Sequence, residues 1–240
     1  GRAVAMNLAA EGAHVVVSGR DVRRGDDVVH AIHVDGGRAE FVAADLDGSS
    51  TRSRELADAA LDMVGGQLDI LVNNAGIYPT AVDAPFADDA TFDRVYGVNV
   101  KAPFFLTHYL APLMADAGGG SIVNLGSWVA RLGIPGDGLY ASTKGALETL
   151  TRSWAAQFGP SGVRVNAVSP GVIRPPELAP GEFAGDSLMA TAPAGDSGHP
   201  GAIAAAVRYL VSDAAGFTHG AVLDIDGGRS QVLLSNPAQR

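Results

Sequence analysis

A serine, a tyrosine and a lysine are the residues of this chain whose types and spacing could do chemistry. Ser127 ends the apolar run SIVNLGS, and thirteen residues later the sequence reads Tyr140-Ala-Ser-Thr-Lys144. Side chains four residues apart meet on one face of a helix. The ammonium group of Lys144 can therefore lower the pKa of the Tyr140 phenol from its ordinary value of about 10. The trio predicts a proton donor that works near neutral pH.

Three further motifs accompany the trio. Asn73-Asn74-Ala75-Gly76 follows an apolar run, Asn99 lies in VYGVNVKAPFF, and Ser169-Pro170-Gly171 ends VRVNAVSPG. A tyrosine and a lysine at this spacing also occur as a solvated pair on exposed helices, so the trio alone is a weak signal. The whole set, in this order and spacing, resembles the classical short-chain dehydrogenase/reductase family. The resemblance covers essentially the whole chain, and the joint motif set is specific.

Strands and helices alternate along the 240 residues, which predicts a parallel sheet with helical crossovers. The resemblance implies an α/β fold, a doubly wound, mostly parallel Rossmann-type sheet in one dinucleotide-binding domain, residues 1–240. The predicted strands are residues 14–18, 41–44, 68–72, 121–125, 163–168 and 221–225. The predicted helices are residues 23–34, 53–64, 101–116, 140–158 and 201–212. Residues 174–200, rich in proline, glycine and alanine, are predicted to form a functional lid or a surface loop.

The first apolar segment already has the pattern of a helix. Val4, Leu8 and Ala9 share one helix face, and Gly12 ends the pattern. In the resembling family this helix follows a first strand and a glycine-rich turn, and residues 1–3 resemble the end of that turn. We therefore expect the natural protein to be longer. A strand missing from the centre of a doubly wound sheet should leave an unpaired interior edge.

The composition of the chain limits the kinds of molecule that the protein can bind. A net charge of -9 disfavours a nucleic-acid partner, which requires a basic surface. The chain has no cysteine, which excludes disulfides, thiolate nucleophiles and cysteine-ligated metals. Its six histidines show no metal-site spacing, so we expect no metal. No apolar run approaches the roughly 20 residues of a membrane span, and no signal peptide is visible. We expect a soluble cytoplasmic protein with no membrane partner.

The residues after the strand at 14–18 bear on which dinucleotide is bound. In enzymes selective for NAD(H), an acidic residue there bonds the ribose hydroxyls and repels a 2′-phosphate. This chain reads Ser18-Gly19-Arg20, and the planar guanidinium of Arg20 could clamp a phosphate. We therefore expect NADP(H) to be preferred and NAD(H) to remain possible. The alternative is that Arg20 pairs with neighbouring Asp21 and touches no ligand.

Other cofactor contacts are implied by the resemblance. Gly1 would lie at the amino end of the first helix, where backbone N–H groups and the helix dipole favour a pyrophosphate. Asp45 and Leu46 resemble the adenine-contact pair, with Asp45 accepting a hydrogen bond from the adenine amino group. A helix cap is the alternative role for Asp45. Asn74, Ala75 and Gly76 would touch the adenosine side, while Asn73 steadies the sheet.

A loop over the nicotinamide is implied for the residues that follow 163–168. Pro170, Gly171 and Ile173 resemble this loop, and the backbone of Ile173 would hold the carboxamide. The family usually has threonine two residues after that isoleucine, whereas this chain has Pro175. Proline offers neither a hydroxyl nor an N–H, so one contact to the cofactor should be lost or replaced.

The resemblance also implies how the catalytic residues divide the work. Ser127 hydrogen-bonds the substrate oxygen, and Tyr140 gives it a proton in reduction and takes one in oxidation. Lys144 bonds the nicotinamide ribose and favours the tyrosinate. Asn99 holds a water that links Lys144 to solvent. The leading prediction is an NADP(H)-dependent oxidoreductase acting on a carbonyl or secondary alcohol. The alternatives are a dinucleotide sensor without turnover, and a lyase or epimerase without net redox change.

Neighbours of the reactive motifs are candidates to line the substrate pocket. They suggest a mostly apolar substrate, and they are Ile77, Tyr78, Trp128, Val129, Leu132 and the segment after Arg174. Arg131 and Arg174 keep an anionic carrier possible. By resemblance, the helices at 101–116 and 140–158 would pack against symmetry mates in a homotetramer. The apolar segment Val232-Leu233-Leu234 could also contact a neighbour.

Overall fold

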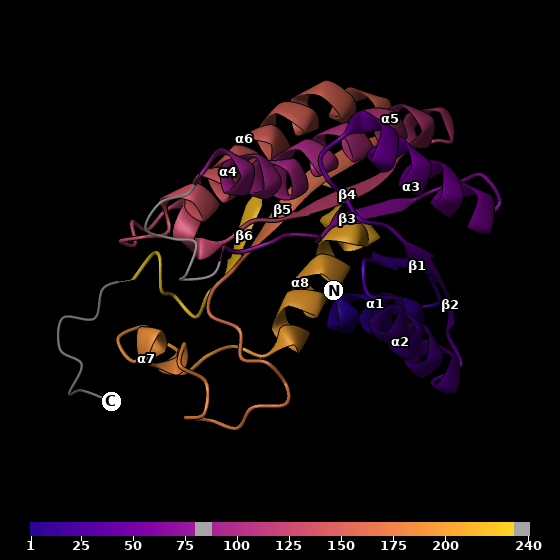
Figure 1. The fold of residues 1–240 in the computed structure, drawn as a ribbon. Coiled ribbons are helices and arrows are strands. Elements are labelled where there is room, and N and C mark those ends of the chain that lie inside the picture. The colour runs from indigo at the N-terminus through magenta and orange to yellow at the C-terminus, as the bar shows by residue number, and fades with distance from the viewer. Residues whose placement is uncertain (80–87, 233–240) are drawn as a thin grey trace.

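Parallel strands between two layers of helices form the frame of the computed structural model, which describes residues 1–79 and 88–232 (Figure 1). The strands are β1 (His14–Gly19), β2 (Arg38–Ala43), β3 (Ile70–Asn73), β4 (Gly120–Leu125), β5 (Val163–Pro170) and β6 (Val222–Ile225). The helices are α1 (Arg2–Ala10), α2 (Val22–Val34), α3 (Ser50–Met63), α4 (Asp89–Tyr96), α5 (Ala102–Asp116), α6 (Gly138–Phe158), α7 (Asp186–Met189) and α8 (Pro200–Val211). Short turns of other helix types are η1 (Gly97–Lys101), η2 (Trp128–Ala130), η3 (Gly159–Ser161) and η4 (Asp213–Ala215).

All strand pairs in the described residues are parallel, which confirms the predicted fold class. β1 pairs with β2, and β3, β4, β5 and β6 follow one another in a second sheet. β1 and β3 each have a single hydrogen-bonded neighbour among the described strands, so the pairing is interrupted between the two sheets. This interruption is the unpaired interior edge that the sequence led us to expect.

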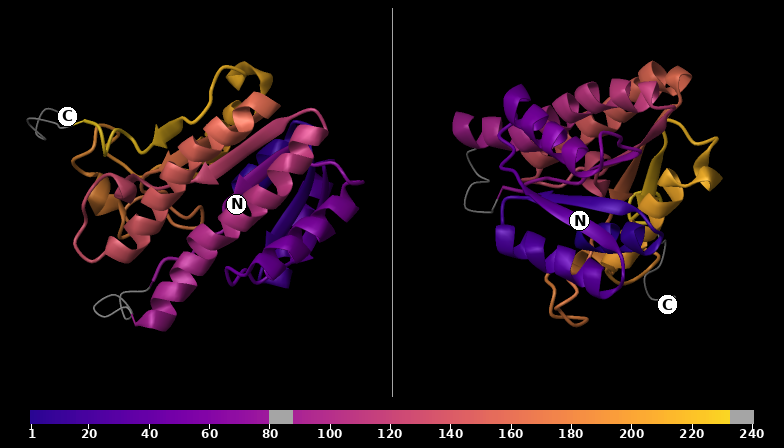
Figure 2. Two further views of the ribbon diagram at one scale, coloured as in Figure 1. Left: turned by 90° about the horizontal axis from the view of Figure 1, so that it is seen from above. Right: turned by 90° about the vertical axis from the view of Figure 1, so that its right-hand side faces the viewer.

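Hydrophobic side chains cover both faces of the four-stranded sheet. Successive side chains of a strand point to opposite faces. Ile122 of β4 packs in a cluster with residues of α3, α5 and α6, whereas Val123 packs in a cluster with α1 and α8. The helices α5 and α6 run next to each other over the first face (Figure 2). Burial on both faces explains why these strands read as continuous apolar runs.

Polar residues at helix starts act as caps. Asp21 accepts a hydrogen bond from Arg24 N at the start of α2, Ser49 does so from Arg52 N at α3, and Asp88 from Thr91 N at α4. These bonds satisfy backbone N–H groups that lack a partner within the helix. Because Ser49 caps α3, the capping role that we considered for Asp45 is wrong.

The structure differs from the predicted elements at several places. β2 begins at Arg38, three residues before the predicted start at Phe41, because residues 38–43 pair along the whole length of β1. The helix predicted at 101–116 is preceded by α4 and by the π-helical turn η1, so the helical path starts at Asp89. Sequence patterning missed both, since a five-residue π turn breaks the helical periodicity. No helix in the described part of the chain is long and apolar enough to cross a membrane.

Candidate active site

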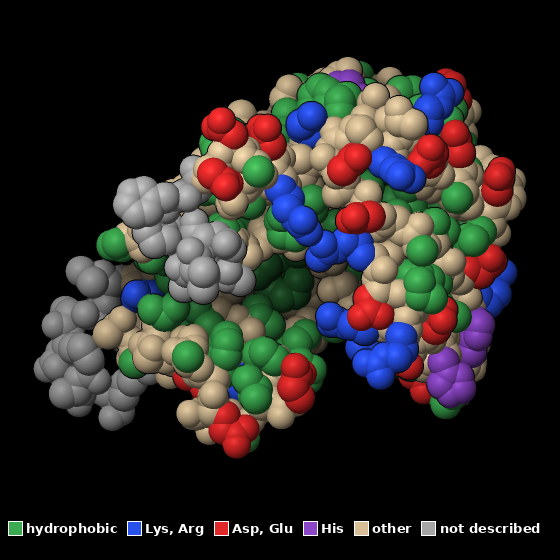
Figure 3. Space-filling model, viewed as in Figure 1, with side chains coloured by type: hydrophobic (Ala, Val, Ile, Leu, Met, Phe, Trp, Pro, Cys, Tyr) green, Lys and Arg blue, Asp and Glu red, His purple; other side chains and the backbone are tan. Residues whose placement is uncertain are grey.

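The reactive motifs gather at the carboxyl edge of the four-stranded sheet, as predicted. Asn73 ends β3, Ser127 comes two residues after β4, and Gly171 follows β5. This edge is where ligands bind in open parallel sheets. Figure 3 shows a deep hollow on this side of the molecule, with apolar side chains inside it and Lys and Arg side chains along its rim.

Lys144 lies inside the protein and close to Tyr140. Its side chain is 4% exposed, and Nζ donates a hydrogen bond to Leu125 O at 2.8 Å. Nζ also lies 5.5 Å from the centre of the Tyr140 ring. Both side chains start from α6, and Leu125 ends β4, so Lys144 joins this helix to the strand that precedes Ser127. The predicted meeting of Tyr140 and Lys144 on one helix face is confirmed.

Burial governs how these two groups titrate. Burial raises the pKa of Tyr140, a hydrogen bond with Ser127 acts to lower it, and the charge of Asp137 raises it further. Burial also lowers the pKa of Lys144 to about 8. The expectation that Lys144 lowers the pKa of Tyr140 below its ordinary value is therefore wrong for this arrangement. The same dry surroundings disfavour the charged form of both groups.

Asn99 connects the motifs through its side-chain amide. Nδ2 donates to Ile77 O at 2.9 Å and to Thr143 Oγ1 at 3.1 Å, while Oδ1 accepts from Ile77 N at 2.8 Å. The residue lies in the π-helical turn η1 and is almost fully buried. Asn99 therefore fixes the loop after β3 against α6, next to Lys144. These three bonds join η1 to residues of other elements.

The loop after β3 has the open backbone that a large ligand needs. Asn73 bonds Asn124 Oδ1 at 2.8 Å across the sheet, which confirms its bridging role, while Asn74, Ala75 and Gly76 are exposed. A Cβ on Gly76 would lie 3.4 Å from Lys144 Nζ and would crowd the site.

The amino end of α1 lies beside that loop. Its cap residue, Gly1, makes no side-chain cap bond, and a Cβ there would lie 2.9 Å from Asn74 Nδ2. Its first turn contains no acidic residue. Uncapped N–H groups, a nearby amide and the Lys144 ammonium are donors for phosphate and ribose oxygens. These residues fit a dinucleotide cofactor.

The side chains of Arg20 and Asp45 form an exposed ion pair away from Ser127, Tyr140 and Lys144. Arg20 Nε lies 3.9 Å from Asp45 Oδ1, and their side chains are 55% and 77% exposed. Asp21 is instead the cap of α2, so the expected alternative of an Arg20–Asp21 pair is wrong. Asp45 and Leu46 line a cavity of about 460 Å³ together with Tyr96 and Val98.

Comparisons with known proteins agree with this geometry. A family model described as enoyl-(acyl carrier protein) reductase matches residues 1–230. The chain belongs to the short-chain dehydrogenase/reductase family. It is an oxidoreductase of this family.

Three relatives illustrate the similarity. A cis-4-hydroxycyclohexanecarboxylate dehydrogenase from Sinomonas cyclohexanicum is 35% identical, over 97% of this chain and 92% of the relative. A cyclopentanol dehydrogenase from Comamonas sp. is 34% identical, over 92% of this chain and 88% of the relative. The crystal structure of a gluconate 5-dehydrogenase from Burkholderia cenocepacia in complex with NADP and tartrate has a TM-score of 0.85 and 30% identity. That match covers 96% of this chain and 91% of the gluconate enzyme.

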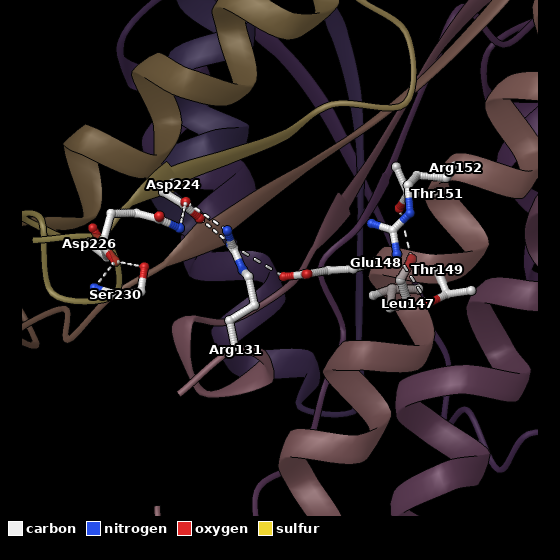
Figure 4. Close-up of polar contacts among 10 residues, drawn as sticks. Arg131, Leu147, Glu148, Thr149, Thr151, Arg152, Asp224, Asp226 and Ser230 are labelled. Atoms are coloured by element: carbon white, nitrogen blue, oxygen red, sulfur yellow. Dashed lines mark hydrogen bonds and ion pairs between the residues drawn. The ribbon is translucent and has the colours of Figure 1, made fainter. Parts of the chain in front are cut away.

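In this short-chain dehydrogenase/reductase, Arg131 forms ion pairs with Asp224 and Glu148 next to the turn that contains Ser127 (Figure 4). These three residues are called the clasp below. Arg131, which follows η2, donates through both Nη atoms to Asp224 of β6. Its Nη2 lies 3.5 Å from Glu148 Oε1 in α6. Glu148 is buried, and this oxygen accepts no hydrogen bond from the described residues. Burial raises the pKa of Glu148, and Arg131 opposes that shift.

Sequence reasoning named Arg131 only as a possible contact to an anionic carrier and missed the clasp. One signal was available, because Glu148 lies four residues after Lys144 and therefore on the same face of α6. The other carboxylate that pairs with Arg131, Asp224, is 93 positions from that arginine, and no local pattern joins them. The clasp ties together the turn after β4, the helix of Tyr140 and Lys144, and β6.

The loop predicted over the nicotinamide packs against the end of β6. Gly171 N donates to Ile225 O at 2.9 Å, and a Cβ on Gly171 would lie 2.5 Å from Asp226 Cα. Glycine is therefore needed here for close packing of two backbones. Pro170 ends β5, and Ile173 forms a parallel bridge with Gly198. Within the described residues no group of three His, Asp or Glu could hold a metal ion.

The segment 174–200 covers apolar residues next to Ser127. It contains the short helix α7, which was not predicted, and Arg174 Nη2 lies 3.1 Å from Asp186 at its start. Met189 and Ala192 are buried against Trp128, Val129 and Val172, with Leu132 and Tyr140 packed on the same cluster. Val232 is half exposed at the end of the described part, and Leu233 and Leu234 lie outside it.

Proposed function

We propose that the protein transfers a hydride between NADP(H) and a carbonyl or secondary alcohol, with Tyr140 as the general acid and base. The observation that carries the proposal is the arrangement of Tyr140 at the carboxyl edge of the sheet. Its phenol shares a hydrogen bond with Ser127, and the ammonium of Lys144 lies under its ring. A proton donor, an orienting hydroxyl and a cation next to one edge suit carbonyl reduction.

The titration of Tyr140 supports its role in reduction. Because burial raises the pKa of Tyr140, the phenol keeps its proton at neutral pH and can donate it to a carbonyl oxygen. Ser127 holds that oxygen through its hydroxyl. When bound, the dinucleotide supplies or accepts the hydride at its nicotinamide ring. In oxidation Tyr140 acts as the base and takes the proton of the alcohol.

Lys144 and Asn99 hold neighbouring elements of the site in place through hydrogen bonds. Lys144 uses one donor on Leu125 O, which leaves its other hydrogens for a ribose hydroxyl. Asn99 fixes Ile77 and Thr143 on either side of that lysine. We keep for Asn99 the further role of holding a water that connects Lys144 to solvent.

NADP(H) is preferred in this proposal because of Arg20. Its guanidinium is half exposed and 3.9 Å from Asp45, a weak surface pair that leaves it able to bind a 2′-phosphate. The complex of the gluconate 5-dehydrogenase relative with NADP supports the same choice. Asp45 and Leu46 then contact the adenine from the adjacent cavity. Gly1 and Asn74 lie near the pyrophosphate, and Ile173 holds the carboxamide.

The proposed substrate class is a secondary alcohol or its ketone. Relatives named for cyclopentanol and for a hydroxycyclohexane carboxylate support an alcohol substrate. Buried apolar side chains of Trp128, Val129 and Met189 next to Ser127 and Tyr140 support a mainly apolar body for it.

A coupled assay tests the proposal against its alternatives. Purified protein is mixed with NADPH and a panel of ketones, and with NADP⁺ and the matching alcohols, while absorbance of the reduced cofactor is followed. Steady consumption of the cofactor with at least one ketone or alcohol of the panel supports the proposal of an oxidoreductase. Tight NADPH binding without turnover, unaffected by Tyr140→Phe, would favour a dinucleotide sensor. Product without net cofactor consumption would favour a lyase or epimerase.

A further inference from the structure

Tyr78 and Asp137 form a polar pair against the ring of Tyr140. The Tyr78 hydroxyl donates a hydrogen bond to Asp137 Oδ1, although the two residues are 59 positions apart. The rings of Tyr78 and Tyr140 meet edge to face, with centres 4.8 Å apart and an angle of 64° between their planes. The bond to Asp137 raises the pKa of Tyr78 to about 12, so this hydroxyl remains a donor at neutral pH.

The Asp137 carboxylate does not cap its own helix, and its negative charge acts on Tyr140 by raising the pKa of that residue. Asp137 occupies the cap position of α6, yet its side chain makes no cap bond. Tyr140 follows three residues later, and Tyr78 bridges the two. The side chain of Tyr78 is exposed and its ring contacts that of Tyr140, so the pair lies at the protein surface beside Tyr140. If Asp137 acted as a helix cap, its carboxylate would accept a hydrogen bond from a backbone N–H of the first turn of α6.

The charge of Asp137 is not neutralised by any basic side chain of the described residues. The two arginines that the sequence offered as contacts for an anion are paired with acidic residues other than Asp137. Arg131 is held by Asp224 and Glu148, and Arg174 is held by Asp186 and Asp196. Arg229 lies over the Trp128 ring at 5.6 Å, and its Nη1 donates to Thr191.

We propose that Asp137, held in place by Tyr78, is a specificity determinant that disfavours substrates with an anionic group and selects uncharged alcohols and ketones. The inference rests on the proposed function and names the charge class of its substrate. A negative substituent brought close to a carboxylate that no cation neutralises is repelled, and the repulsion is strongest where water is displaced. Discrimination then comes from a repulsive element rather than from an added contact.

A matched substrate pair tests this inference. cis-4-Hydroxycyclohexanecarboxylate and its carboxamide have nearly the same shape and differ in charge. Each is measured with NADP⁺ as a substrate, and as a competitive inhibitor of the best uncharged alcohol in the panel. We expect kcat/KM for the carboxamide, or its affinity as an inhibitor, to exceed that of the carboxylate by about tenfold or more.

Two variants assign that discrimination to the pair. Asp137→Asn should reduce the carboxamide-to-carboxylate ratio towards one, because it removes the charge and keeps the shape. Tyr78→Phe should reduce the ratio by a smaller factor, since it keeps the ring on Tyr140 but releases the carboxylate. Asp62→Asn, at an exposed position of α3, makes the same change in net charge and should leave the ratio as in the parent.

The outcomes separate this inference from the proposed function. No turnover of any alcohol or ketone would contradict the proposed function, and the charge preference would then be read from the direct binding affinities of the carboxylate and the carboxamide for the protein loaded with NADP⁺. Turnover with equal or greater kcat/KM for the carboxylate would overturn the inference and point to Arg229 as an anion contact. An unchanged ratio in Asp137→Asn would overturn it as well.

Discussion

Two proposed parts of the site are built in opposite ways: the catalytic edge, formed by Ser127, Tyr140, Lys144 and Asn99, and the ribose edge, formed by Arg20 and Asp45. Ser127, Lys144 and Asn99 are each less than one-tenth exposed, and their hydrogen bonds join different elements. Arg20 and Asp45, by contrast, are exposed side chains joined by one 3.9 Å ion pair. Burial fixes geometry and shifts pKa values at the first edge, whereas solvent screens the charges at the second.

This difference separates two tasks. Proton transfer needs groups held in one geometry, so its residues belong to the packed core. Choice between two dinucleotides needs only a charge in reach of a phosphate, which an exposed arginine supplies. Substitutions at the catalytic edge should therefore have large effects that depend on their partners. Substitutions at the ribose edge should have smaller, nearly independent effects.

The largest effect is expected at Tyr140. Tyr140→Phe removes the proton donor and leaves the ring, so turnover should fall by about two to four orders of magnitude while cofactor binding is largely kept. Single-turnover kinetics and NADPH titration by fluorescence measure the two quantities. Tyr209→Phe, near the end of α8, is the control for loss of a tyrosine hydroxyl. Near-normal turnover of Tyr140→Phe would refute the assignment.

Lys144 should make stability depend on pH. Its pKa is lowered to about 8 in the folded protein, from an ordinary value of 10.5. Between these values the unfolded chain binds more protons than the folded one, so stability should rise with pH across this window. The gain, about 2 to 3 kcal/mol at most, should be missing in Lys144→Met. Urea unfolding of both proteins at pH 8 and pH 10 measures it, and equal pH slopes would contradict the prediction.

Variants of the clasp test whether the effect of a substitution at the catalytic edge on stability depends on the ion-pair partner of the substituted residue. Arg131→Met leaves Glu148 buried near Asp224 without its cation, and should cost about 2 kcal/mol of stability. Adding Glu148→Gln should recover part of that loss, because the buried charge is gone. Urea unfolding at pH 7 measures both variants.

An exposed pair provides the matched control for the clasp. Arg208 bonds Glu11 at 2.6 Å, but both side chains are about half exposed. Arg208→Met should cost less than about 1 kcal/mol. Equal losses of stability in Arg131→Met and Arg208→Met would contradict the predicted difference between buried and exposed ion pairs. Strictly additive effects of Arg131→Met and Glu148→Gln would contradict it as well.

The smallest effect is expected at the ribose edge. Arg20→Glu should weaken NADPH binding about tenfold more than NADH binding, since it replaces a phosphate donor by a repelling charge. Arg38→Glu, at the amino end of β2, gives the same net charge away from this edge. Fluorescence titrations with both cofactors compare the variants. Equal weakening of the two cofactors by Arg20→Glu would indicate a structural arginine.

Local sequence patterns predicted those parts of the fold and site that depend on residues close in the chain. Apolar runs located the six strands, and the four-residue spacing placed Tyr140 and Lys144 on one helix face. The patterns missed α4 and η1, because a π turn interrupts helical periodicity. The tetramer, the cytoplasmic location and the role of residues 174–200 as a lid stay predictions.

Contacts between distant segments account for what the patterns missed. The clasp joins Arg131 to Asp224, and Tyr78 bonds Asp137 across 59 positions. The direction of the Tyr140 pKa shift was also mispredicted, because spacing reveals a neighbouring charge but not the depth of burial. Tyr78 was expected to line the pocket, but its carboxylate partner was not.

The sequence by itself determined the family, the order of strands and helices, and the identity of the groups that can transfer a proton. These follow from periodicity and motif spacing, which are properties of neighbouring residues. Only the tertiary structure decided how those groups titrate, what holds the Ser127 turn and which charge stands beside Tyr140. Burial and pairing depend on which distant segments pack together, and that packing is a property of the whole chain.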